Sequence, residues 1–441
     1  MKIDLNAIID PYDARVVATT AADGSVAEAH FDLAGLPRVD HLLEGKSAAE
    51  AVYMAEHLCG ICPAAHHLAG VRALDHLAPR PVPHTAATVR RILHAASHID
   101  QHSLRFAAIN RETAVQLRKF AKNTMAAVGS PGHFPTTAVP GGVAYMPSRE
   151  QVTQLQENCV EILHRMRAVC DIALTTISGE PVVTNSATLA AAEPGRQLNE
   201  PYRDEFLGIN VALVDSQGHP DLLGSHVKAV HANGELVFCE PAEHWGELVR
   251  EAYPGAAAPQ PYIAQLGSEQ GRYRVGPIAQ LSVGELLTPE AAAMQEQWLA
   301  DPRQSLGARA VIALHCVEDI ACAAQELAEA YAQGKPEDRP LPTEEAGPLR
   351  AGTATGLVDS PRGILAHTYT LDDKETVQTA TVLTPTAQNE PWLADLLRTA
   401  LSRASAESQE QALEDSIREA DPCLPISSAP AGTMKLRIDM S

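Results

Sequence analysis

Apolar residues recur at helical spacing along much of the chain, and the first clear case is residues 46–62. Ser47 and Glu50 form an S-x-x-E capping box there, which is typical of the start of a helix. The apolar positions that follow match one face of a helix: Val52, Met54, Ala55 and Leu58. We therefore expect a helix that ends at the cysteine pair of the sequence CGIC.

Longer segments with the same periodicity predict the main helices. One helical face of the first such segment carries these apolar residues: Val89, Ile92, Leu93 and Ala96. The predicted long helices are residues 86–109, 148–174, 307–334 and 390–404. Aromatic residues make up 4% of the chain while alanine is abundant, which favours closely packed helices over an aromatic-rich β-sandwich.

Strand patterns occupy the remaining parts of the chain. Residues 3–34 contain β-rich runs on both sides of ADGS, a sequence typical of a hairpin turn. A second pair of strand-like runs, GILAHTYTLDD and TVQTATVLTP, is joined by a turn at DDKET. Residues 180–285 alternate short strand-like runs with turns. Glycines and prolines predict irregular structure at 129–147 and an acidic surface connection at 335–348.

These patterns predict an α+β fold in which long helices dominate. We expect a single large domain over residues 1–441, with a central helix bundle and small β-sheets at its periphery. Its parts are a β-rich N-terminal segment, a helical core with the CGIC motif, a mixed middle region, and a helical and β C-terminal part: residues 1–45, 46–180, 181–300 and 301–441.

Charge and composition narrow the class of protein. The net charge is -21, with 55 acidic and 34 basic residues, so we expect neither nucleic acid binding nor attraction to anionic lipid. No apolar run is long enough for a membrane span, and acidic residues interrupt the N-terminal segment where a signal peptide would be apolar. We therefore expect a cytoplasmic protein whose 8 cysteines do not form a disulfide framework.

Cys59 and Cys62 stand three residues apart, so both thiolates could reach one soft or borderline metal ion. His66 would face the same way, either as a ligand or, more in keeping with its position, as a hydrogen-bond donor to a coordinated sulfur. Cys423 follows Pro422 near the other end of the chain. Two other interpretations stay open, namely a pair of core or redox thiols and a zinc site of the three cysteines with His66. We expect the remaining cysteines to be buried small apolar residues: Cys159, Cys170, Cys239, Cys316 and Cys322.

Several motifs, in one order along the chain, resemble those of a single family. EHLCGICPAAHHLAGVRAL resembles the N-terminal motif R-x-C-G-x-C-x-x-x-H of the [NiFe]-hydrogenase large subunit, and ADPCLPISSAP resembles its C-terminal motif D-P-C-x-x-C-x-x-H. Between them, GHFPTTAVPGGV, DSPRGILAHTY and TPTAQNEPWL follow further motifs of the family. The resemblance extends over essentially the whole chain and is closest to the cytoplasmic, multi-subunit branch.

The resemblance implies a centre in which four cysteines bind nickel, and two of them also bridge to an iron with two cyanide ligands and one carbon monoxide. By position, Cys59 and Cys423 would be terminal nickel ligands and Cys62 a bridging ligand. The place of the second bridging cysteine is taken by Ile426, and the family's terminal histidine is replaced by Ala429. The nickel site is therefore incomplete, and standard hydrogenase activity is in doubt.

The pocket for the iron ligands, by contrast, matches the family. Arg362 and Thr386 would donate hydrogen bonds to the two cyanides, and Pro361 and Pro385 would line the pocket. Without the resemblance, Arg362 would be interpreted as a salt-bridged surface arginine. Asp40 stands where the family has a glutamate, and it could serve as a shorter proton relay.

Three functions are consistent with these residues, and the incomplete set of cysteines favours the first slightly over the second. The first is a large-subunit paralogue of the HupK/HoxV kind, which would hold the iron with its cyanide and carbonyl ligands during hydrogenase assembly. The second is a catalytic large subunit with an altered metal centre that interconverts hydrogen with protons and electrons. The third is a structural subunit with zinc or no metal. The expected partners are hydrogenase maturation proteins for the first and a small subunit with iron–sulfur clusters for the second.

Overall fold

The structure is a computed structural model that describes residues 13–23, 25–32, 40–175, 206–256, 258–300, 305–334, 347–405, 407–429 and 434–440. The predicted surface connection at 335–348 lies almost entirely outside the described residues, as does the start of the predicted middle region, up to residue 205. Helices and small sheets together make up the described part, so the predicted α+β class with dominant helices is confirmed.

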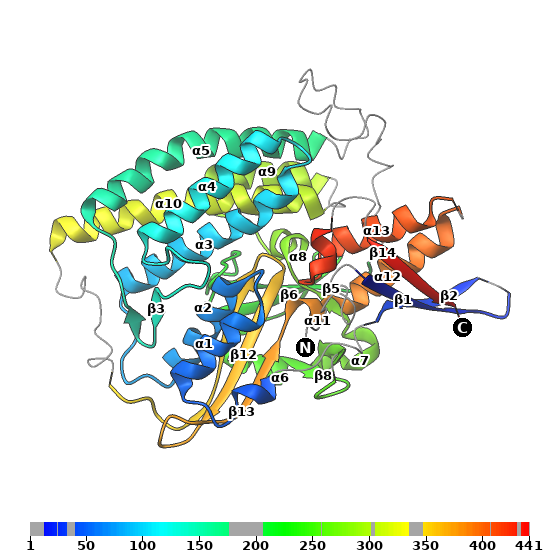
Figure 1. Cartoon of the computed structure of the whole chain (residues 1–441), viewed down its shortest axis with the longest axis horizontal. Coiled ribbons are helices and arrows are strands. Elements are labelled where there is room, and N and C mark those ends of the chain that lie inside the picture. Colours follow the sequence, from blue (N-terminus) through cyan, green and yellow to red (C-terminus); the bar gives the residue numbers. More distant parts are fainter. Residues whose placement is uncertain are drawn as a thin grey trace, which may run out of the picture.

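The long helices lie side by side in one bundle (Figure 1). They are α3 (His84–Phe106), α4 (Arg111–Ala127), α5 (Arg149–Thr175) and α10 (Ser305–Gln333). α10 packs against both α3 and α5, and its buried face is rich in alanine, which allows close approach. α9 (Pro289–Ala300) packs against α10. α4 was not predicted from the sequence, although its N-cap Asn110 accepts a hydrogen bond from the Thr113 amide at 3.0 Å.

The cysteine pair lies between two helices. α1 (Ala48–Leu58) begins as predicted at Ser47, whose hydroxyl accepts from the Glu50 amide at 3.3 Å. α2 (Pro63–Asp75), which was not predicted, starts directly after Cys62 with a proline at its first position. It packs against a three-stranded antiparallel sheet of β11 (Gly352–Ser360), β12 (Gly363–Leu371) and β13 (Val377–Leu383). A Cβ on Gly356 would lie 2.1 Å from the Ala69 carbonyl oxygen, so the close packing of α2 on β11 requires glycine there.

The middle region forms a second sheet, as its alternating pattern predicts. Its strand order is β10-β5-β6-β7, with bounds Tyr273–Arg274, Ile209–Val214, His226–His231 and Leu236–Pro241. β5 is buried at every position.

Two short strand pairs accompany this sheet: β3 (Ala138–Val139) with β4 (Gly142–Val143), and β8 (Val249–Glu251) with β9 (Pro261–Ile263). The segment 129–147 is thus irregular as expected, apart from the two-residue strands β3 and β4. The short helices among these elements are α6 (Trp245–Leu248), α7 (Gly267–Gln270), α8 (Pro277–Ser282) and α11 (Pro385–Gln388), and the 3-10 turns are η2 (Asp40–Leu43), η5 (Ala242–His244), η6 (Ala264–Leu266) and η9 (Pro425–Ser428).

The two ends of the chain meet in one sheet (Figure 1). β1 (Asp13–Thr20) and β2 (Val26–Phe31) form the predicted hairpin, and β14 (Lys435–Met440) pairs with β1 in parallel. α12 (Glu390–Arg403), as predicted, packs against β2. It is followed by α13 (Gln409–Ala420), which was not predicted. α13 ends three residues before Cys423, and the segment after it returns to pair with β1, so the C-terminal cysteine lies near the start of the fold. Among the described helices, none is long and apolar enough to cross a membrane.

Candidate metal centre

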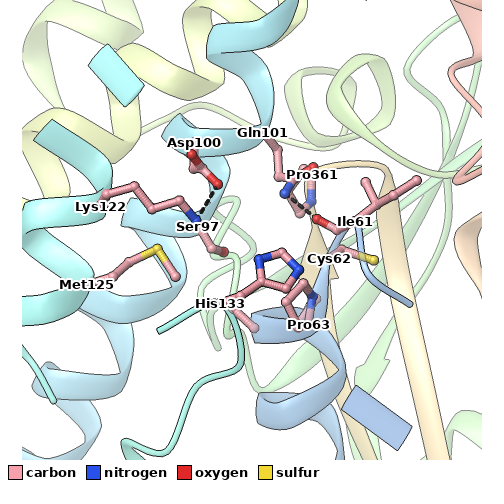
Figure 2. A pocket seen from close by; sticks show the side chains of 12 residues that line it. Ile61, Cys62, Pro63, Ser97, Asp100, Gln101, Lys122, Met125, His133 and Pro361 are labelled. Carbon is pink, nitrogen blue, oxygen red and sulfur yellow. Dashed lines mark hydrogen bonds and ion pairs between the residues drawn. The ribbon is translucent and has the colours of Figure 1, made fainter. Parts of the chain in front are cut away.

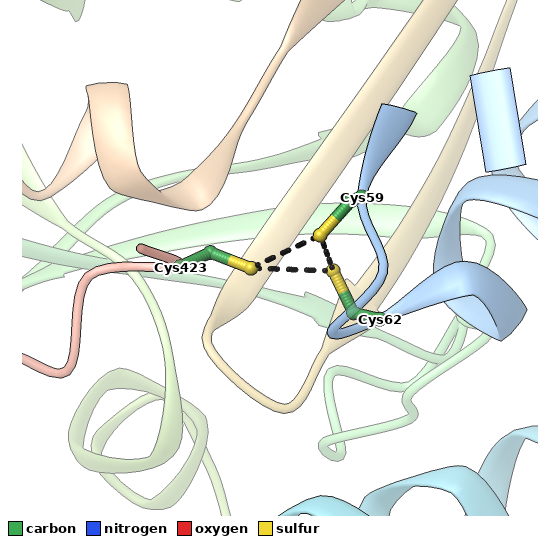
Figure 3. Close-up of side chains that lie close together, drawn as sticks. All are labelled: Cys59, Cys62 and Cys423. Carbon is green, nitrogen blue, oxygen red and sulfur yellow. Dashed lines mark hydrogen bonds between the residues drawn. The ribbon is translucent and has the colours of Figure 1, made fainter. Parts of the chain in front are cut away.

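Three cysteines from opposite ends of the sequence come together at one point (Figure 3). The Sγ atoms of Cys59 and Cys62 lie 3.2 Å apart, and that of Cys423 lies 3.3 Å from the first and 3.4 Å from the second. Within the described part of the chain, this is the group of histidine, cysteine or carboxylate side chains that could hold a metal ion. The thiolate donor set suits a soft or borderline metal.

Local structure fixes the direction of each sulfur. Cys59 is the C-cap of α1, and Cys62 is the N-cap of α2, where the helix dipole favours a negative charge. The turn between them is held by side chains from elsewhere: Gln101 Nε2 donates to the Ile61 carbonyl, and His133 Nε2 donates to the Gly60 carbonyl at 2.8 Å.

The three thiols influence each other's ionisation strongly. Hydrogen bonds from Cys423 and Cys62, with a smaller contribution from His66, lower the pKa of the Cys59 thiol. The same contacts and burial raise the pKa of Cys62, and the contact with Cys59 is the main cause that raises the pKa of Cys423 to about 12. Ionisation of one thiol thus opposes ionisation of its neighbours, and a bound cation would favour the thiolate form of all three.

His66 lies beside Cys59 and begins a buried hydrogen-bonded chain. Its Nδ1 lies 3.0 Å from Nε2 of His367, whose Nδ1 lies 2.7 Å from the Tyr369 hydroxyl. Burial lowers the pKa of His367 and raises that of Tyr369, so both are neutral. If His66 donates to the sulfur, its Nδ1 must accept from His367 Nε2–H, and the Tyr369 O–H then donates to His367. His66 is outside the group of converging ligand atoms, which favours a hydrogen-bonding role over coordination.

Arg362 is buried beside the cysteines rather than on the surface, with 9% of its area exposed. Its Nε donates to the Asp421 carbonyl at 3.1 Å, and its terminal nitrogens lie 3.4 Å from the Asp421 carboxylate and 3.4 Å from the Gln101 amide oxygen. Burial alone would lower the pKa of Arg362, but Asp421 and the three cysteines outweigh it, and the net pKa is raised. These bonds use three of its five N–H groups, which leaves two without a partner among the described residues.

Asp421 holds a cluster of cations in place. Its carboxylate forms an ion pair with Arg105, lies 3.4 Å from Arg362 and lies 3.9 Å from Arg309. Burial alone would raise its pKa, but the three guanidinium groups lower it well below its usual range. Asp421 adopts the left-handed conformation that ends α13, with φ of 48°. The same residue therefore ends the helix, aims the next two residues towards the sulfurs and fixes Arg362.

Thr386 is joined directly to the cysteine group. Its hydroxyl oxygen accepts a hydrogen bond of 2.8 Å from the backbone amide of Cys423, which leaves its O–H free to donate elsewhere. Pro385 is buried at the start of α11, and a small cavity is lined by Arg362, Thr386 and the backbone segment that leads to Cys423. Arg362 and Thr386, two of the four pocket residues suggested by the resemblance, thus line one cavity next to Cys423.

A second pocket reaches Cys62 from another side (Figure 2). Pro361 and Cys62 line one part of it, and the ion pair of Asp100 Oδ2 with Lys122 Nζ, 2.9 Å long, lines another. His133 lies at its edge and is exposed. Cys62 thus shares a small pocket with the Asp100–Lys122 ion pair.

Ile426 and Asp40 do not extend the set of ligand atoms. Ile426 is 2% exposed and belongs to the main hydrophobic core, so the place of the family's fourth cysteine is filled by a hydrocarbon side chain. Ala429 is likewise buried. Asp40 is buried in η2, and its carboxylate accepts from the Val382 amide at 3.3 Å, which directs it towards β13.

The expectation that the remaining cysteines are buried is wrong at two positions. Cys159, Cys170 and Cys316 are buried among helices, whereas Cys322 is exposed on α10 and Cys239 is half-buried at an edge of its sheet. Helical and strand periodicity assigns a residue to the apolar face of its element, but it does not show which residues of that face are exposed to solvent.

Some residues of the site were not foreseen. Asp421, Gln101, His133, His367 and Tyr369 position the cysteine turn, Arg362 or His66. A signal was present for Asp421, because an aspartate directly before a proline and a cysteine can end a helix and bind a cation at once. No local pattern connects Gln101 or His133 with a turn 40 or 73 residues away.

Comparisons with known proteins find hydrogenase subunits that are similar to this chain. The sequence model of the family described as nickel-dependent hydrogenase matches residues 38–111, which include α1, α2 and the cysteine pair. One vhu subunit of the F420-non-reducing hydrogenase from Methanocaldococcus jannaschii is 25% identical over 86% of this chain and 93% of that relative. A crystal structure of an NAD+-reducing [NiFe]-hydrogenase in the H2-reduced state superimposes with a TM-score of 0.74 at 26% identity, over 93% of this chain and 95% of that one. The chain is thus similar to hydrogenase large subunits over most of its length, and its cysteine-pair region matches the nickel-dependent hydrogenase model.

Two further proteins extend the likeness to nearly the whole chain. NAD-reducing hydrogenase HoxS subunit beta of Cupriavidus necator is 24% identical over 98% of this chain and 96% of that relative. The Ni-Fe-Se hydrogenase from D. vulgaris Hildenborough shares the fold, with a TM-score of 0.59 at 16% identity over 93% of this chain and 95% of that one. The matched family model is that of nickel-dependent hydrogenases, and this chain brings together three cysteines that could hold a metal ion.

Proposed function

We propose that this chain is the metal-binding large subunit of a hydrogenase that interconverts hydrogen with protons and electrons, with a centre held by three cysteines. The observation that carries the proposal is the convergence of Cys59, Cys62 and Cys423 beside Arg362 and Thr386. The similarity of the whole chain to catalytic hydrogenase subunits supports this function over one confined to assembly.

The residues fit an iron that carries cyanide and carbon monoxide ligands. Cyanide on iron accepts strong hydrogen bonds in a dry pocket, and two free N–H groups of Arg362 and the O–H of Thr386 are donors of the required kind. Pro361 and Pro385 are apolar and offer no competing group. When bound, such a centre supplies the redox and Lewis-acid chemistry by which hydrogen is split.

The number of converging ligands disfavours a structural zinc. Such a zinc is almost always held by four protein ligands in a closed tetrahedral site. Within the described residues three thiols converge, and His66 lies outside this group, so a closed zinc site would be incomplete.

The chain's own residues can hold and move protons near the sulfurs. The chain of Tyr369, His367 and His66 keeps an N–H directed at Cys59, because burial prevents His367 from taking up a proton of its own. Asp421 and the cysteines keep Arg362 charged, and the ion pair with Asp421 holds its side chain in place before any ligand binds. Asp40 remains a proposed proton relay, shorter by one carbon than the glutamate of the family.

A second function is favoured by one specific observation, the buried Ile426. An isoleucine supplies no lone pair, so nickel would be held less tightly than on four thiolates. A protein that binds the iron unit through three cysteines without completing the nickel site would suit a carrier in hydrogenase assembly. Its partners would be maturation proteins, whereas the catalytic function calls for a small subunit with iron–sulfur clusters.

Metal analysis, infrared spectroscopy and a dye-coupled hydrogen assay on the anaerobically purified protein distinguish these functions. The catalytic function predicts iron, nickel, infrared bands of carbon monoxide and cyanide, and hydrogen-dependent dye reduction. A carrier should show the bands and iron without nickel or turnover. The proposal as a whole is wrong if neither bands nor metals are found.

A pair of cysteine variants controls this experiment. Cys62→Ala should abolish the infrared bands because it removes a ligand, whereas Cys170→Ala, at a fully buried cysteine of α5, should leave them unchanged and affect stability alone. Equal loss of the bands in both variants would indicate general misfolding and would refute the assignment of Cys62 as a ligand.

A further inference from the structure

A column of buried histidines lies along one face of α3, outside the set of residues that surrounds the sulfurs. His94, His98 and His102 recur every four residues and are 1%, 0% and 2% exposed. Their ring centroids lie 4.8 Å and 5.7 Å apart in sequence order. At 1.5 Å of rise per residue, the column spans about 12 Å through the interior of the bundle.

The hydrogen bonds of the first two histidines fix which nitrogen carries the proton. Nε2 of His94 and Nε2 of His98 both lie 2.9 Å from the backbone carbonyl oxygen of Asp359. A carbonyl oxygen can only accept, so both Nε2 atoms carry a hydrogen. Burial is the main cause that lowers the pKa of both rings, which are therefore neutral. Each Nδ1 is then a bare acceptor that points away from Asp359.

These acceptors have no hydrogen-bond partner within the described part of the chain. Nδ1 of His94, Nδ1 of His98 and Nε2 of His102 are all buried and unpaired there. Two other side-chain atoms are also buried without a partner among the described residues, namely Oε1 of Gln280 and Nε of Arg309. The Nε2 of the same Gln280 donates to the Asp359 carboxylate at 2.6 Å. A buried polar atom without a partner costs about 1–3 kcal/mol. Such a concentration of them in one network indicates bound molecules that can both donate and accept.

The two ends of the column reach functionally different places. At one end, the charges of Arg309, Arg362 and Asp421 act on the pKa of His102, whose lowering is caused mainly by burial, so this end of the column faces the ion pair beside the sulfurs. At the other end, His94 lies near Arg72, which is half-buried and donates to the carbonyl oxygens of Leu223 and Gly224 at 2.8 Å and 3.0 Å. The histidine face thus connects a partly exposed arginine with the metal centre.

We propose that a file of internal water molecules runs along this face of α3 and conducts protons between Arg72 and the Arg362–Asp421 pair. Water donates to Nδ1 of His94 and His98 and accepts from Arg309, and the histidines are positioning residues that keep their Nε2–H on Asp359. For each proton that enters the file at one end, a different proton leaves at the other, so no bond to a histidine is broken. The water file stands on the geometry alone, and its proton-conducting role rests on the proposed function.

A crystal structure of the purified protein, at a resolution that locates ordered water, tests the file directly. We expect waters within about 3 Å of Nδ1 of His94 and of His98. Apolar contacts or a protein donor at these atoms would overturn the proposal. This part of the test needs no bound metal, so it is independent of whether the chain turns over hydrogen.

Variants of one histidine test the proton-conducting role. His98→Phe fills the face with an apolar ring and should slow dye-coupled hydrogen turnover about tenfold, with a changed solvent isotope effect and unchanged infrared bands. His98→Gln keeps a donor and an acceptor and should retain most of the rate, and His94→Phe serves as a second variant if His98→Phe does not fold. Unchanged turnover in a folded phenylalanine variant would refute conduction. Ordered waters in a wild-type protein without turnover would remove the conducting role together with the proposed function, while the water file would stand.

Discussion

Asp421 offers the sharpest test of how the site is held together. Its carboxylate is 4% exposed and faces Arg105, Arg309 and Arg362. Asp421→Asn removes the negative charge and keeps the shape. Asparagine also tolerates the left-handed backbone conformation at this position, where φ is 48°. The variant therefore isolates the effect of the charge from the effect of the helix end.

The expected loss of stability is large, because three guanidinium groups would remain near one another without their counter-ion. Removal of one partner from a buried ion pair costs about 3–5 kcal/mol. A matched control is Asp395→Asn, since Asp395 pairs with Arg272 at 3.1 Å but both side chains are partly exposed, at 33% and 45%. An exposed pair of this kind contributes about 0.2–1 kcal/mol.

The assay is equilibrium unfolding in denaturant, with the free energy taken from the midpoint and slope of each variant. The pH dependence supplies a second measurement. The pKa of Asp421 is lowered in the folded state. Its carboxylate therefore adds its full share to the free energy of unfolding above the pKa of an unfolded aspartate. That share is lost as the pH falls from there towards the lower pKa of the folded state. The difference between wild type and Asp421→Asn should therefore shrink below a pH of about 4. Equal effects of the two variants at neutral pH, or a difference that does not shrink in acid, would refute the reasoning.

Three further predictions concern the vacant ligand position, the packing of α2 and a buried carboxyl group. Ile426→Cys should raise the nickel content of protein that is matured together with its metal-insertion machinery, because the variant restores a thiolate. The control Ile426→Val should leave the nickel content unchanged, and equal nickel in both variants would contradict the idea that Ile426 replaces a nickel ligand. Gly356→Ala should lower the free energy of unfolding by about 3 kcal/mol or more, since its Cβ would lie 2.1 Å from the Ala69 carbonyl oxygen. Gly246→Ala, where nothing lies within 4 Å, should be neutral or slightly stabilising in the same denaturation experiment. Burial raises the pKa of Asp359 to about 7, so the native state holds its proton more tightly and stability should fall by up to about 4 kcal/mol as the pH rises from 4 to 7. Asp359→Asn should flatten that dependence, and identical pH profiles of the two proteins would contradict it.

The sequence was most informative where local physics decides structure. The capping box at Ser47, the long helices and the hairpins on both sides of ADGS and DDKET are confirmed, because caps, apolar periodicity and turn residues act over a few positions. The elements that were not predicted have weaker local signals. α4 and α13 carry many charged residues on their exposed faces, and β11 is interrupted by glycine. α2 follows directly on a cysteine motif. It is buried on nearly every side, so its sequence lacks a clear polar face.

The candidate site divides in the same way. The motifs around Cys59, Cys62 and Cys423 pointed to thiolate donors, and the order of five motifs along the chain pointed to the family. The partners that give these residues their properties come from distant elements. His367 on β12 reaches His66 on α2, and Gln101 on α3 reaches both the cysteine turn and Arg362.

The amino-acid sequence by itself determined which chemistry is available to this protein: three thiolates, a guanidinium, a hydroxyl and an isoleucine where a fourth thiolate could have stood. The tertiary structure alone decided that these groups share one interior point, because the parallel pairing of β14 with β1 and the left-handed turn at Asp421 bring residue 423 back to the helix ends at residues 59 and 62. Burial, distance and the direction of each donor depend on contacts between residues more than 300 positions apart, and no local pattern encodes such contacts.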